Sequence, residues 1–270
     1  MKQRYYGLIF ALLLVLVGNV RADTLEEGVA AARRADFATA LKIFTPLAEQ
    51  GSAIAQYNLG LMYDTGRGVK EDFTIAFNLY QQAAAQGDSA AQNNLALMYV
   101  EGRGVAKNLV EAIRLFKLSA NQGYVNAQDN LSEMYRRGQG VVRNDAEAFK
   151  WASLAANQGL PTAMTRIAGM YFEGKGVTKN YAMALKWMRL AASRGEPVAQ
   201  SNLAEFYVEG DAVGKDLPRA YMWFKISAGL GNGWAAGRAQ VLSKRLKQEQ
   251  IIWADNTAKE CLAQKFVGCD

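Results

Sequence analysis

The chain has 270 residues, of which 50% are hydrophobic, 21% are charged, four are proline and none is histidine. This is the composition of a globular protein rather than of a disordered chain. The lack of histidine excludes a Ser-His-Asp triad, an imidazole general base and a histidine-ligated metal. Two cysteines, Cys261 and Cys269, are too few for a four-thiolate zinc site. We therefore expect no metal, no cofactor and no enzymatic activity.

The first 22 residues are organised like a secretory signal peptide. Lys2 and Arg4 give a basic start, an uncharged apolar run follows over 8–17, and small side chains lead up to Ala22. The apolar run is much shorter than the roughly 20 residues that a membrane-spanning helix needs, which favours cleavage over anchoring. We expect cleavage after Ala22, a periplasmic or secreted mature protein, and no stable membrane span after cleavage.

Cleavage of the signal peptide would lower the net charge of the protein. The full chain carries a net charge of +6, but removal of Lys2, Arg4 and Arg21 leaves 28 basic and 25 acidic residues, a net +3. These charges are spread along the chain without a basic block, so the sequence lacks the footprint of a nucleic-acid-binding protein. We expect no nucleic-acid partner, and the sequence leaves the oligomeric state open.

The rest of the chain follows a period of 36 residues. Several sets of residues recur at this spacing, which chance does not produce and which is the mark of a repeat architecture. The sets are Gly51, Gly87, Gly123, Gly159, Gly195 and Gly231; Ala40, Ala76, Ala112, Ala148, Ala184 and Ala220; Tyr63, Tyr99, Tyr135, Tyr171 and Tyr207; and Gly66, Gly102, Gly138, Gly174 and Gly210.

Each unit is expected to form a helix A, a turn and a helix B. In the unit 91–126, Ala91, Leu95, Met98 and Tyr99 share one helical face, and the second half of the unit repeats this spacing. A glycine follows each helix A, and an Asp or Asn suited to N-capping precedes each helix B. One such pair leaves its apolar face uncovered, so the units should stack without a break into an all-α, right-handed α/α superhelix.

The pattern A-x-x-x-L-x-x-M-Y-x-x-G-x-G-V, followed by A-x-Q-G, resembles Sel1-like repeats, relatives of the tetratricopeptide repeat. The resemblance covers five full units, with a partial N-terminal repeat before them and C-terminal capping helices after them. The capping helices are expected over Ala235–Leu246 and Gln248–Phe266. The expected boundaries are 23–54 for the partial repeat, 55–90, 91–126, 127–162, 163–198 and 199–234 for the five repeats (55–234 in all), and 235–270 for the cap.

The resemblance implies a non-catalytic adaptor that binds a protein or peptide partner on the concave helix-A surface. Envelope signalling regulation, envelope or flagellar assembly, and virulence are all compatible roles. The alternative is an enzyme or binder acting on peptidoglycan or β-lactams, as suggested for relatives with a cysteine pair in each repeat. This chain has no cysteine in any repeat and no evident S-x-x-K motif, which favours the adaptor.

One polar column lies beside the apolar face of helix A. Its amides could clamp the backbone of an extended peptide, with the column Glu101, Arg137, Glu173 and Glu209 tuning the choice of ligand. The alternative, which we favour, is that each side chain bonds locally within its own or the next repeat. The candidate binding residues are Asn58, Asn94, Asn130, Arg166 and Asn202.

Three other features have structural interpretations. Cys261 and Cys269, in an exported chain, predict a disulfide that stabilises the C-terminal end by on the order of 2–3 kcal/mol. The column of Trp151, Trp187 and Trp223 alternates with leucine, which indicates core packing rather than a ligand platform. The segment 169–176 nearly spells a phosphate-binding loop, but it ends in glycine where magnesium needs Ser or Thr, and it fits an ordinary passage from helix A to the turn.

Overall fold

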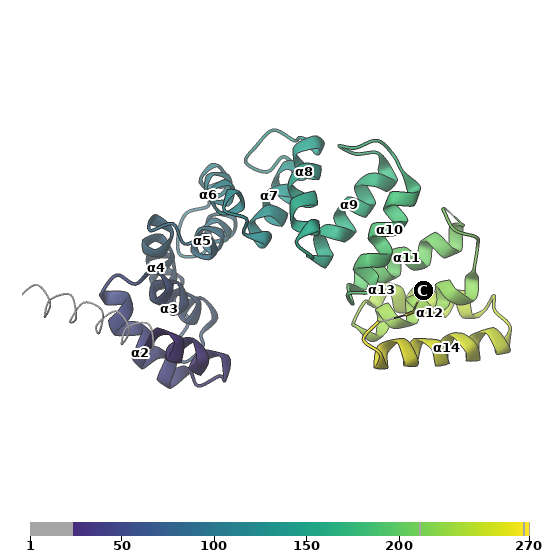
Figure 1. Ribbon diagram of the computed structural model, residues 1–270, viewed down its shortest axis with the longest axis horizontal. Coiled ribbons are helices and arrows are strands. Elements are labelled where there is room, and N and C mark those ends of the chain that lie inside the picture. Colours follow the sequence, from purple (N-terminus) through teal and green to yellow (C-terminus); the bar gives the residue numbers. More distant parts are fainter. Residues whose placement is uncertain (1–23, 211, 267, 270) are drawn as a thin grey trace, which may run out of the picture. The chain divides into compact units, whose positions relative to one another are not determined.

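The computed structural model describes residues 24–210, 212–266 and 268–269, and within these ranges it contains helices and no strand (Figure 1). The expected all-α architecture is therefore confirmed. The predicted signal peptide, 1–22, lies outside the described residues. Residues 24–33 form a helix, and the elements that follow are α2 (Phe37–Glu49), α3 (Ala53–Thr65), α4 (Phe73–Ala85), α5 (Ser89–Glu101), α6 (Leu109–Asn121), α7 (Val125–Arg137), α8 (Asp145–Asn157), α9 (Pro161–Glu173), α10 (Tyr181–Ala192), α11 (Pro197–Glu209), α12 (Leu217–Gly229), α13 (Gly233–Ser243) and α14 (Gln248–Ala263).

The odd-numbered helices from α3 to α13 are the A helices, and the even-numbered ones from α2 to α12 are the B helices. Each A helix from α3 to α11 packs against the B helix that follows it in the chain. The sequence predicts one continuous stack, whereas the chain divides into two compact units, 1–124 and 125–270. None of the described helices is long and apolar enough to cross a membrane.

The helix ends follow the repeat pattern. The side chains of Asp36, Asp72, Asn108, Asn144, Asn180 and Asp216 each accept a hydrogen bond from a backbone N–H in the first turn of a B helix. They satisfy donors that have no partner inside the helix. The fifth repeat has Ala212 where the others have a second turn glycine. Ala212 takes the same left-handed conformation, with φ of 59°, so the turn is kept without glycine.

Small residues in the A helices allow the close packing that the repeats need. Gly60 lies in the middle of α3, and a Cβ added there would be 3.0 Å from the ring of Tyr80. At the equivalent place in α7, the Ser132 hydroxyl donates to the carbonyl oxygen of Ala148 over 2.8 Å. The column Gly60, Ala96, Ser132, Ala168 and Ala204 is buried throughout. It is therefore a packing column.

The tryptophan column belongs to the core, as expected, since Trp151 and Trp223 are buried and Trp187 is half-buried. The Trp151 indole N–H donates to Glu147, one turn earlier in α8. The Trp223 N–H has no hydrogen-bond partner among the described residues, because Arg219 stands where the first tryptophan has its glutamate.

A pair of glutamines clamps most repeats. Near the start of helix A, Gln92 is buried and donates to the carbonyl oxygen of Ala84, in the last turn of the preceding B helix, over 3.2 Å. Its own side-chain oxygen accepts from Gln122, at the end of the following B helix, over 2.8 Å. Two otherwise unpaired polar groups are thus satisfied together. The side-chain donor and acceptor pairs are Gln86 to Gln56, Gln122 to Gln92, and Gln158 to Gln128.

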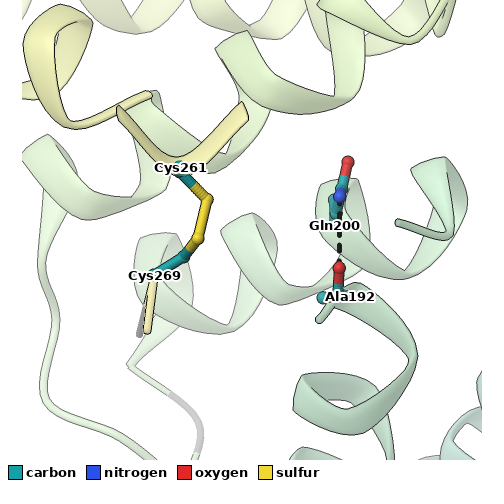
Figure 2. Close-up of a disulfide and its surroundings, with 4 residues drawn as sticks. All are labelled: Ala192, Gln200, Cys261 and Cys269. Atoms are coloured by element: carbon teal, nitrogen blue, oxygen red, sulfur yellow. Dashed lines mark hydrogen bonds between the residues drawn. A yellow bond between two sulfur atoms is a disulfide. The ribbon is translucent and has the colours of Figure 1, made fainter. Parts of the chain in front are cut away.

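The clamp is incomplete in the fifth repeat. Gln200 is fully buried and donates to the carbonyl oxygen of Ala192 over 3.2 Å, as Figure 2 shows. Leu230 replaces the second glutamine, so the side-chain oxygen of Gln200 is left buried without a donor among the described residues. A buried acceptor without a partner is destabilising.

The C-terminal end is closed by the expected disulfide. Cys261 and Cys269 are bonded, with their Cα atoms 5.4 Å apart (Figure 2). The sequence predicts that the closing helix reaches Phe266, but α14 ends at Ala263 because Lys265 and Phe266 both adopt positive φ. This turn brings the Phe266 ring onto Gly195, where an added Cβ would lie 2.5 Å from it. The lack of a side chain at Gly195 therefore also allows the C-terminal segment to pack against this turn.

The glutamine clamp makes opposite predictions for two substitutions. Gln122→Leu, which introduces the residue of the fifth repeat, removes the donor to a buried oxygen and should destabilise the protein by about 1–3 kcal/mol. Leu230→Gln supplies the missing donor to Gln200 and should stabilise by about 0.5–1.5 kcal/mol. Urea denaturation followed by circular dichroism measures both. Equal effects of the same sign would show that the clamp contributes nothing specific.

Candidate functional site

The predicted polar column of the A helices is engaged locally in the first unit. The Asn58 side chain donates to the carbonyl oxygen of Ile54 in its own helix over 2.8 Å. The side-chain oxygen of Asn94 accepts a hydrogen bond from the Asn93 amide over 3.1 Å. Asn94 also hydrogen-bonds the Tyr80 hydroxyl, and this bond opposes the rise that burial causes in the pKa of Tyr80. These contacts are of the local kind that the sequence favours.

A polar cluster ties the first two full repeats together beside these asparagines. The hydroxyl of Tyr80, which is fully buried, donates to Asp64 over 3.3 Å, and the Arg103 guanidinium contacts the same carboxylate at 2.5 Å. Arg103 also lies over the ring of Phe73, 5.1 Å from its centroid. Burial holds the pKa of the Tyr80 hydroxyl well above its ordinary value of 10. The hydroxyl therefore stays protonated and serves as a hydrogen-bond donor, not as a nucleophile.

In the second unit, the arginines of this column form ion pairs between successive A helices. Arg166, in α9, contacts Asp129 over 3.0 Å and also pairs with Glu133, both in α7. Glu133 accepts two further hydrogen bonds from Arg136, at 2.6 and 2.8 Å, and pairs with Arg137. The Arg136 bonds, with the charges of the neighbouring arginines, lower the pKa of Glu133 to about 2.

An equivalent pair recurs two repeats later. Arg238, in α13, makes two hydrogen bonds to Glu205, in α11, at 2.7 and 2.9 Å. Its guanidinium lies over the rings of Phe224 and Trp234, at 5.6 and 5.9 Å from the centroids. Arg238 and Arg166 occupy the same position of the 36-residue repeat, and so do Glu205 and Glu133.

A pocket opens between α9, which carries Arg166, and α11, which carries Glu205. It has a volume of about 250 Å³. It brings together three residues that the sequence places on the A helices as candidate binding residues, namely Asn202, Glu173 and Glu209. Asn202 makes no side-chain hydrogen bond among the described residues. The remaining lining residues are Gly169, Phe172, Met188, Glu205 and Phe206.

The other candidate residues do not reach this pocket. Asn130 is engaged in another interaction, and Arg166 is held in the pairs to α7. Within the described part of the chain, no group of three or more Asp, Glu or Cys residues is placed to hold a metal ion. The sequence pattern points to the amides but not to Gly169 as a pocket residue. The lack of a side chain at Gly169 is nevertheless visible in its repeat column, which consists of Leu61, Leu97, Glu133, Gly169 and Glu205.

The cluster at Glu133 predicts a pH-dependent stability. Its folded pKa of about 2 lies below the ordinary value of 4.5, so its contribution is complete above pH 4.5 and is lost as the pH falls toward 2. Glu133→Gln should cost about 1–2 kcal/mol at pH 7, and the difference from the parent protein should vanish near pH 2. Denaturation measured across this pH range tests it.

Glu111→Gln is the matched control, because within the described part of the chain Glu111 pairs only with the exposed Arg114 three residues later. Its effect should stay below about 0.5 kcal/mol at every pH. A Glu133 variant as mild as this control would contradict the importance of the inter-helix ion pairs.

The repeats of this chain match a known family of repeat proteins. The model of the Sel1 repeat matches residues 53–88, 89–124, 125–160, 161–196 and 197–232. Each match begins two residues before the unit expected from the sequence, and each begins at the first residue of an A helix. No curated protein matches the chain significantly.

Two solved structures are similar over most of the chain. A Sel1 repeat protein from Oxalobacter formigenes is 30% identical, with a TM-score of 0.78, over 86% of this chain and 96% of that one. A protective antigen of uropathogenic Escherichia coli strains, with an SLR fold, is 34% identical, with a TM-score of 0.71, over 82% of this chain and 49% of that one. With five matched repeats and this likeness in structure, the chain belongs to the Sel1 repeat family.

Proposed function

We propose that the protein is an exported, non-catalytic adaptor that binds a partner protein or peptide through its A helices. Sel1 repeats generally form scaffolds for protein–protein interaction, which is the coarse function of this family. The observation that carries the proposal for this chain is the α9–α11 pocket, whose lining includes Asn202 without a side-chain partner among the described residues. An unpaired amide in an open pocket is available to a ligand.

The A helices suit this role because their packing leaves one set of positions free to vary. The core column of Leu95 holds only leucine or isoleucine from repeat to repeat, whereas the column of Asn202 holds Asn or Arg and that of Gly169 holds Leu, Glu or Gly. Side chains outside the core add little to folding, so they can change with the partner at small cost in stability. Envelope signalling regulation, envelope or flagellar assembly and virulence are the processes in which such an exported adaptor fits.

Export is supported by the signal-like segment 1–22 and by the disulfide, since disulfides persist mainly in oxidising compartments. Both features favour a periplasmic or secreted location, which we propose for the mature chain.

One mass measurement tests export and oxidation together. The protein purified from the periplasm should begin at Asp23 and be two hydrogen masses lighter than the same chain after reduction, because Cys261 and Cys269 are joined. Intact-mass spectrometry before and after reduction gives both values. A chain that retains its first 22 residues, or free thiols in periplasmic material, would contradict the proposal.

Site-specific photo-crosslinking tests the binding surface. A photoreactive residue placed at Asn202 or at Glu101, on the A helices, should give adducts with one partner protein in periplasmic extract. The same residue at Val110 or Leu154, which are exposed on B helices α6 and α8, should not. Adducts formed only from the B-helix positions would place the partner elsewhere, and adducts from neither set would argue against an adaptor.

A further inference from the structure

In the second unit, an Arg–Glu ion pair bridges two of the interfaces between successive A helices, and a third interface lacks this pair. Arg166 bridges α9 to Glu133 of α7, and Arg238 bridges α13 to Glu205 of α11. The interface of α9 with α11 lies between them. There, Asn202 occupies the arginine position and Gly169 the glutamate position, so neither partner of the pair is present. The pocket of about 250 Å³ is found at this interface.

Packing does not explain the glycine at position 169. Gly60 has a similar mid-helix position in α3, and there an added Cβ would be crowded by the ring of Tyr80 at 3.0 Å. A Cβ added to Gly169 meets nothing within 4 Å, and its φ lies outside the left-handed region. Glycine in the interior of a helix destabilises it relative to alanine. A destabilising residue that the fold does not require is expected at a functional site, where it keeps space open.

The chemistry of the lining suits a planar cation on an apolar stem. Phe172, Phe206 and Met188 supply apolar walls, and the two rings meet edge to face with centroids 5.4 Å apart. Glu173, Glu205 and Glu209 supply three carboxylates. Two are already paired, Glu173 with Lys175 and Glu205 with Arg238.

The third carboxylate is available. Glu209 forms no ion pair among the described residues, and Asn202 offers its amide oxygen in the same pocket. A guanidinium is donor-only and binds carboxylates with two parallel hydrogen bonds. The chain itself shows this recognition at Arg238, whose guanidinium contacts a carboxylate and lies over aromatic rings.

We propose that the α9–α11 pocket binds one arginine side chain of the partner protein, in the place that Arg166 and Arg238 fill at the neighbouring interfaces. This inference rests on the proposed adaptor function and names the chemistry of its ligand. The volume fits one side chain, since pockets for whole small ligands measure about 300–1,000 Å³. Arginine is also a frequent anchor of protein–protein interfaces.

The test uses Met188, which lines the pocket, as a reporter. The mature protein is labelled with ¹³C-methyl methionine, and N-acetyl-arginine methylamide is titrated while the methyl resonances are recorded. The Met188 signal should shift, with a Kd on the order of 1–10 mM for a single side chain. The signal of Met98, buried in the first unit, should not. N-acetyl-norleucine methylamide, which has the stem without the cation, should shift Met188 much less.

Two variants fill the pocket and share a matched control. Gly169→Leu introduces the leucine that Leu61 and Leu97 provide at the same repeat position. The double variant Gly169→Glu with Asn202→Arg introduces the ion pair of the neighbouring interfaces. Both should raise the melting temperature and abolish the Met188 shift. Gly237→Leu is the control, because Gly237 lies in α13, outside the pocket, and an added Cβ there also meets nothing within 4 Å. It should leave the shift unchanged.

The outcomes separate this inference from the adaptor function. No Met188 shift with the arginine probe, an equal shift with norleucine, or a shift that survives both filling variants would overturn the arginine pocket. The titration needs no partner, so such a failure would leave crosslinks from the A helices standing. Conversely, a specific arginine shift without any crosslinked partner would support the pocket and count against the adaptor.

Discussion

No helix pair of this protein can bury its apolar face by itself, and the rest of the structure depends on that constraint. A pair of thirteen-residue helices buries its apolar face only when the next pair covers it. The small residues at Gly60, Ala96 and their equivalents let the helices approach closely. The buried glutamines then satisfy polar groups that this approach removes from water, so packing and hydrogen bonding are solved by the same repeat.

This division of roles explains where binding chemistry can arise. The core columns are fixed by packing, whereas the columns of Asn202 and Gly169 lie where successive A helices meet. Where these two columns provide arginine and glutamate, as at Arg166 and Glu133, they join two repeats through an ion pair. Where they provide Asn202 and Gly169, the helices still pack through their cores and a pocket remains. Cohesion between repeats and ligand binding are thus alternative uses of the same two positions.

Much of the fold could be predicted from the sequence, because it rests on local signals repeated at a fixed spacing. The helix caps at Asp72 and Asn108 and the turn glycines each lie where the 36-residue pattern places them. The end of α14 at Ala263 was missed, since no glycine or proline marks it and the positive φ of Lys265 and Phe266 depends on tertiary contacts. The division after Tyr124 was missed as well, because the repeat register continues through it.

The candidate site was less predictable, for a different physical reason. A column of asparagines is visible in the sequence, but whether each amide bonds locally depends on neighbours such as Ile54 for Asn58. The glutamine clamp is not predictable from the sequence, although both of its columns keep glutamine through the first three full repeats, because buried polar residues resemble surface ones in a single sequence. The pocket at Gly169 arises from a missing side chain, and its significance depends on what surrounds it in space.

Hydrogen–deuterium exchange of the protein bound to its crosslinked partner tests the central claim most directly, namely that the A helices carry the binding surface. The account predicts that partner binding slows amide exchange most in α9 and α11, over 161–173 and 197–209, and less in α8 and α10, which are B helices of the same unit. Slower exchange confined to the B helices, with α9 and α11 unchanged, would contradict it.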